Sequence, residues 1–127
     1  MLQDISDQEF DTLITRAIDE LPQEYIKRLD NVAVVMADEP SAEQRQKMKL
    51  DSNQLLLGLY EGVPKPGRGA GYNLVLPDKI TLFKNQLLAI STNQTELFEN
   101  IKRTIWHEIA HHYGLNHEQI SKLQKSK

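Results

Sequence analysis

All four histidines of the chain fall between positions 107 and 117, in the stretch His-Glu-Ile-Ala-His-His-Tyr-Gly-Leu-Asn-His. Its pattern is H-E-x-x-H-x-x-G-x-x-H. Side chains four residues apart lie one above the other on an α-helix, so His107 and His111 can offer two imidazole nitrogens to one tetrahedral zinc ion. The spacing therefore predicts a zinc site on a helix.

The other polar positions of the motif complete this site. Glu108 stands one step round the helix from the first histidine, where a general base for a zinc-activated water is needed. Gly114 can adopt a left-handed conformation that ends the helix and turns the chain back, so that His117 reaches the same ion. We expect one Zn²⁺ per chain, bound by His107, His111 and His117, with Glu108 as the catalytic residue.

Four further residues could take part in the site, but the sequence supports each of them less strongly. His112 lies about a hundred degrees round the helix from His111, so we expect it to point away from the metal. Glu118 could replace His117 as third ligand, but its position fits interaction with the dipole of a following short helix better. Tyr113 and Tyr72 are candidates for stabilising a developing oxyanion, although tyrosines at such positions are more often packing residues.

The motif is expected to lie on a long helix that starts near Thr95, after the potential capping residues Asn93 and Gln94. Asn100 and Thr104 precede the ligands on the same face, which makes that face polar. The remaining faces are apolar and should pack into a core: Leu97, Phe98, Ile101, Ile105, Trp106, Ile109 and Tyr113.

Length and composition limit the class of protein. The 127 residues suit a single domain, residues 1–127. A formal net charge of −3 and a pI near 5.8 disfavour a nucleic-acid partner. The chain has no cysteine, its N-terminus lacks the features of a signal peptide, and no segment has the length and apolar character of a membrane span. We expect a cytoplasmic protein that does not bind membranes.

The pattern of residues 6–53 predicts a helix, a further helical turn, a strand and an exposed loop. Ser6 or Asp7 can cap a helix that runs to about Leu21, and Pro22 begins a further turn that ends near Leu29. The unbroken apolar run Val32 to Met36 is typical of a central strand buried on both faces. An exposed loop with a helical turn should follow at residues 37–53.

Further strands are expected at residues 55–60, 72–75 and 79–83, the last two joined by a turn at Pro77. The Gly- and Pro-rich segment 64–71 resembles a phosphate-binding loop only superficially, because no G-K-[ST] sequence or helix follows it. We interpret it as a loop that could cover a cleft. The order of elements predicts an α+β fold, with the helices on one side of a small twisted sheet.

The motif resembles the extended H-E-x-x-H-x-x-G-x-x-[HD] signature of the zincin metallopeptidases. The chain as a whole is similar to the minimal zincin-like family of small bacterial proteins, in which the eleventh motif position, here His117, is often Asp. The resemblance rests on the motif and on four flanking segments: 10–22, 29–35, 57–64 and 76–83. It implies a small mixed sheet packed against an N-terminal helix and the motif helix, and a zinc-dependent peptidase that acts on a peptide or protein substrate.

The chain departs from larger zincins in two ways, and both make the zinc site better supported than proteolytic activity. Met1, Met36 and Met48 all precede the motif, so no methionine turn can follow it. The chain is also too short for a second subdomain that completes a substrate cleft. Two alternatives to a peptidase therefore stay open: a zinc-dependent endoribonuclease-like hydrolase, which has a similar histidine motif without the glutamate, and a non-enzymatic domain stabilised by zinc.

Overall fold

The chain was analysed as a computed structural model, which describes residues 5–27, 29, 32–51, 53–62 and 78–112. Its first helix, α1 (Asp7–Glu20), begins as the sequence predicts. The Ser6 hydroxyl accepts a hydrogen bond from the Glu9 amide, and the Glu9 carboxylate accepts one from the Ser6 amide, which satisfies two amides at the helix start. After Pro22, the short helix α2 (Gln23–Ile26) forms the predicted further turn.

Three described strands form one mixed sheet with the order β1-β3-β2. Strand β1 (Val32–Ala37) pairs in parallel with β3 (Asp78–Phe83), and β2 (Gly58–Glu61) pairs antiparallel to the other side of β3. The small mixed α+β fold is therefore confirmed. Strand β2 begins three residues later than the sequence suggests.

The prediction that residues 32–36 form a central strand buried on both faces is wrong. The strand exists, but it lies at one edge of the described sheet, and Val35 is 39% exposed. The central strand is β3, in which Ile80, Leu82 and Phe83 are fully buried. A β-branched apolar run indicates that a segment forms a strand. Whether that strand lies at the centre or at the edge of the sheet depends on strands distant in sequence.

Two short helices follow strands of this sheet along the chain. Helix α3 (Ala42–Lys47), capped by Ser41, is the helical turn expected in the exposed segment after β1. Helix α4 (Lys84–Ala89) follows β3 directly and was not predicted, because it is short and has no side-chain cap. The predicted strand 72–75, the turn at Pro77 and the Gly- and Pro-rich segment 64–71 lie outside the described residues.

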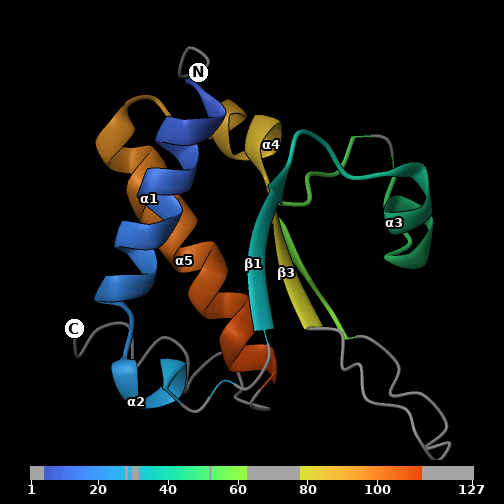
Figure 1. The fold of residues 1–127 in the computed structure, drawn as a ribbon. Helices are drawn as coiled ribbons and strands as arrows, with labels where there is room; N and C mark the ends of the chain where they lie inside the picture. Colours follow the sequence, from blue (N-terminus) through green and yellow to red (C-terminus); the bar gives the residue numbers. More distant parts are fainter. Residues whose placement is uncertain (1–4, 28, 30–31, 52, 63–77, 113–127) are drawn as a thin grey trace, which may run out of the picture.

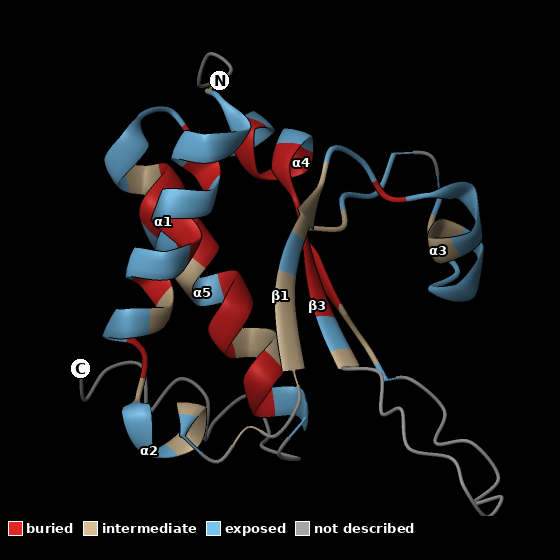
Figure 2. Cartoon of the chain, viewed as in Figure 1, coloured by how far each residue is buried: buried red, intermediate tan, exposed pale blue. Residues whose placement is uncertain are grey.

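The longest helix, α5 (Gln94–His112), packs against α1 and against strands β2 and β3. Helices α1 and α5 form a layer on one side of the sheet, whereas α3 lies on the opposite side (Figure 1). The buried residues of both helices face each other and the sheet, and their outer surfaces are exposed (Figure 2). Within the described ranges, no helix is both long and apolar enough to cross a membrane.

Candidate metal centre

Helix α5 begins at Gln94, close to the predicted start. The Asn93 side chain accepts a hydrogen bond of 2.8 Å from the Glu96 amide, and the Glu96 carboxylate accepts one of 2.9 Å from the Thr92 amide. These bonds satisfy backbone groups that a helix start leaves without partners. The predicted apolar residues that lie in the described part of the helix are all buried: Leu97, Phe98, Ile101, Ile105, Trp106 and Ile109. This packing fixes the helix that carries the motif.

Two polar residues on the face that precedes the histidines, Asn100 and Thr104, are buried. Asn100 and Thr104 are 9% and 8% exposed, and the Thr104 hydroxyl donates a hydrogen bond of 2.7 Å to the Asn100 carbonyl oxygen. The Asn100 amide group donates one of 3.0 Å to Ser91. The buried polar atoms of this face thus have partners, and the bond to Ser91 joins the first half of α5 to the segment that precedes it.

His107 and His111 lie one turn apart near the end of α5. Their ring centroids are 4.3 Å apart, with an angle of 57° between the ring planes. His107 is half-buried and His111 is exposed. Two neighbouring imidazoles from one helix are the donor chemistry that zinc prefers, so these residues fit two positions of a zinc site.

The third expected ligand, His117, lies outside the described residues, as do Gly114, Glu118 and the oxyanion candidates Tyr113 and Tyr72. Within the described ranges, no three His, Asp or Glu side chains converge on one point that could hold a metal ion. The described part of the chain thus contains the helical half of the expected site, and the half that would follow the glycine remains a prediction.

The motif glutamate contacts the sheet. Oε1 of Glu108 accepts a hydrogen bond of 3.1 Å from the backbone amide of Tyr60 in β2. Burial raises the pKa of the Glu108 carboxyl above its ordinary value, and the Tyr60 hydrogen bond opposes this rise to a smaller extent. A carboxyl with a raised pKa is better matched to taking up and returning a proton near neutral pH.

Gly58 allows β2 to approach α5 this closely. A Cβ atom at this position would lie 2.6 Å from the Thr104 methyl carbon, far below ordinary van der Waals contact. Gly58 faces Thr104, and Tyr60 faces Glu108 one helical turn later. The sequence analysis missed both strand residues as part of the site, although a glycine inside a strand can signal close backbone approach.

Tyr60 makes two further contacts. Its hydroxyl donates a hydrogen bond of 2.8 Å to Oδ2 of Asp78 at the start of β3. Its ring stacks on His112, with the centroids 4.8 Å apart and the ring planes 16° apart. His112, which we expected to point away from the metal, therefore packs against β2. Tyr60 links the end of the motif helix to two strands.

Comparisons with known proteins identify a family and a similar fold. The model of a family described as zincin-like metallopeptidase matches residues 29–126. A solved structure of a conserved hypothetical protein from T. thermophilus is similar in fold, with a TM-score of 0.56 and 21% sequence identity over 86% of this chain and 94% of that one. No protein with a curated description matches the chain. Because the family model covers most of the sequence, including the motif, the chain belongs to the zincin-like metallopeptidase family.

Proposed function

We propose that this protein is a zinc-dependent peptidase in which Glu108 is the general base. Membership of the zincin-like family supports zinc-dependent peptidase chemistry in general. The observation that carries the proposal is the position of Glu108. Its carboxylate is partly buried and held by the Tyr60 amide, beside two histidines whose rings lie 4.3 Å apart.

Each motif residue has a distinct role in this proposal. His107 and His111, joined by His117, would hold one zinc ion per chain. When bound, zinc acts as a Lewis acid that acidifies water and polarises a peptide carbonyl. Glu108 accepts a proton from the attacking water at a carboxylate oxygen and then delivers it to the leaving amine. The raised pKa of Glu108 makes its carboxylate a stronger base for the first of these two proton transfers.

In the sheet formed by the described strands, the outer edge of β2 supplies a place for an extended substrate. The Phe83 amide donates to the Leu57 carbonyl, so the backbone groups of residues 59 and 61 also face β3 and those of Gly58 and Tyr60 face outward. The strand that the sequence predicts at residues 72–75 is another candidate edge for an extended substrate, but it lies outside the described residues. We propose β2 for this role, because its outward backbone groups lie beside the motif helix and, apart from the Tyr60 amide that already donates to Glu108, can pair with a peptide backbone.

The substitution Glu108→Gln tests this function. It keeps the size of the side chain and an acceptor for the Tyr60 amide but cannot accept a proton. Incubation with a mixed peptide pool, followed by mass spectrometry of the products, should show cleavage by the zinc-loaded protein and a loss of roughly a hundredfold to ten-thousandfold in the variant. Zinc content should be equal in both proteins. Cleavage by Glu108→Gln at the original rate would disprove the mechanism.

A further inference from the structure

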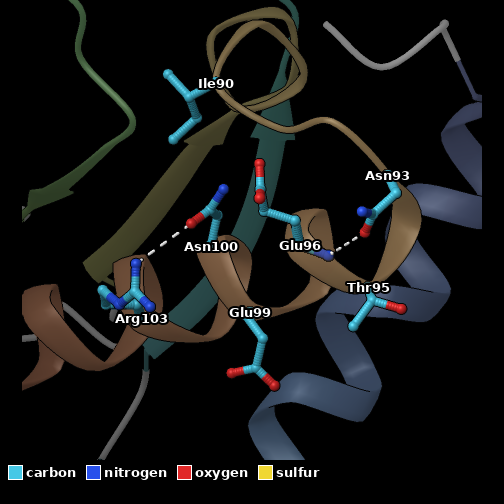
Figure 3. A pocket seen from close by; sticks show the side chains of 7 residues that line it. All are labelled: Ile90, Asn93, Thr95, Glu96, Glu99, Asn100 and Arg103. Carbon is cyan, nitrogen blue, oxygen red and sulfur yellow. Dashed lines mark hydrogen bonds between the residues drawn. The ribbon is translucent and has the colours of Figure 1, made fainter.

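An open hollow of about 540 Å³ lies along the first half of α5, where the helix passes Ile90 at the end of α4. Its lining includes Glu96, Glu99, Asn100 and Arg103, whose side chains rise from successive turns of α5 (Figure 3). None of these residues belongs to the motif. The proposed zinc chemistry therefore does not account for the hollow.

The hollow continues the face of α5 that carries the histidines. Arg103 precedes His107 by four residues and Asn100 precedes it by seven, so all three lie on one side of the helix. With a rise of 1.5 Å per residue, Arg103 and Asn100 stand about 6 Å and about 10 Å along the axis from His107. An extended chain covers this distance with two or three residues.

Among the residues that line the hollow, Arg103 is the group that can bind an anionic ligand, although Glu96 and Glu99 also line it. The Glu96 carboxylate accepts the Thr92 amide, and the Glu99 carboxylate lies 3.5 Å from Nζ of Lys102. The Arg103 guanidinium, by contrast, donates a long bond of 3.3 Å to the neutral side chain of Asn100 and pairs with no carboxylate of the described residues. Arg103 is exposed and has several donors in a planar array that matches a carboxylate.

The direction of β2 decides which part of a substrate would reach Arg103. Gly58 lies beside Thr104 and Tyr60 beside Glu108, so β2 and α5 run in the same direction. A substrate paired antiparallel to the outer edge of β2 would run from the His111 end of α5 toward Arg103. Its residues on the C-terminal side of the cleaved bond would then lie over the hollow.

We propose that this hollow is a specificity subsite in which Arg103 binds a carboxylate two or three residues beyond the scissile bond. This inference rests on the proposed peptidase function. The carboxylate can belong to an Asp or Glu side chain or to the free C-terminus of a short substrate. Asn100 positions the guanidinium through the hydrogen bond at its Oδ1.

Binding to the zinc-loaded Glu108→Gln protein tests the subsite without turnover. The probes are fluorescein-labelled octapeptides that differ only by Glu or Gln at one scanned position, with an amidated C-terminus. A second series carries Gln throughout and has a free or amidated C-terminus at successively shorter lengths. The same peptides are measured with Arg103→Gln added. Lys47→Gln is the matched control, because it removes one positive charge from the exposed surface of α3.

We expect Glu to bind about tenfold more tightly than Gln at one position, as for a charge-assisted hydrogen bond. A free C-terminus at a matching length should give the same gain if the terminal carboxylate is the ligand. Arg103→Gln should abolish the preference, and Lys47→Gln should leave it intact. The proposal fails if carboxylate and amide bind equally, or if the preference persists in Arg103→Gln. Cleavage of the same peptides by the protein with Glu108 present decides the peptidase function separately.

Discussion

The backbone amide of Tyr60 lies 3.1 Å from Oε1 of Glu108 and donates a hydrogen bond to it, although the two residues are 48 positions apart in the chain. This bond joins the outer edge of β2 to the motif helix at the residue that we propose as the general base. A backbone donor cannot rotate away as a side chain can, so the position of Glu108 depends on how closely the strand approaches the helix. That approach is set by Gly58 and Thr104.

Gly58→Ala should displace β2 from α5, because the new methyl group would lie 2.6 Å from the Thr104 methyl carbon. We expect a loss of about 1–3 kcal/mol in the free energy of unfolding, as for other overpacked sites, together with a fall in kcat. Thr104→Ser removes that methyl carbon and keeps the hydroxyl that donates to Asn100. Adding Thr104→Ser to Gly58→Ala should restore most of both losses, as measured by urea unfolding and peptide cleavage. A double variant no better than Gly58→Ala would contradict the role of this contact.

The stability of the metal-free protein should depend on the protonation of Glu108. Because burial raises its pKa in the folded state, the folded protein holds the proton more tightly than the unfolded chain does. The cost of the buried charge is absent below the ordinary carboxyl value of about 4.5, grows as pH rises through the folded-state pKa, and is fully present above it. In chelator-treated protein, Glu108→Gln should therefore increase the free energy of unfolding at neutral pH and have little effect at pH 4. Urea unfolding at the two pH values measures this difference, and an equal effect at both would refute it.

Substitution of either helical histidine should remove zinc. We expect about one zinc per chain by mass spectrometry of untagged protein, and near-complete loss in His107→Ala and His111→Ala. His112→Ala is the matched control, because this residue stacks on Tyr60 and should leave zinc content unchanged. Zinc at a hundred times its dissociation constant should also add about 2.7 kcal/mol to stability, and this gain should vanish with His107. Zinc retained in His107→Ala would show that the motif does not hold the metal.

Truncation of a buried side chain of α5 should lower the free energy of unfolding substantially. Ile101 is fully buried between α5 and its neighbours, so Ile101→Ala should cost about 2–5 kcal/mol through lost burial and the cavity left behind. Ile90 is 37% exposed, so the matched substitution Ile90→Ala should lower the free energy of unfolding much less. Chemical denaturation of the two variants measures the contrast. Equal losses would mean that α5 is packed differently from this arrangement.

The sequence by itself determined the features that depend on neighbours along the chain. Helix α1 with its cap at Ser6, the start of α5 near Asn93, and the spacing of His107 and His111 all follow from helical periodicity and capping chemistry. The family was also recognisable, because the motif and its flanking segments are local patterns. His117 as third ligand was predicted in the same way and lies outside the described residues.

Tertiary structure decided what depends on distant partners. It placed β1 at the edge of the described sheet and β3 at its centre, although the apolar run of β1 favours the opposite. It also brought the Tyr60 amide to Glu108. Every residue except proline has a backbone amide, so sequence carries no sign of which amide will meet a given carboxylate; only the pairing of β2 with β3 and its packing on α5 select Tyr60.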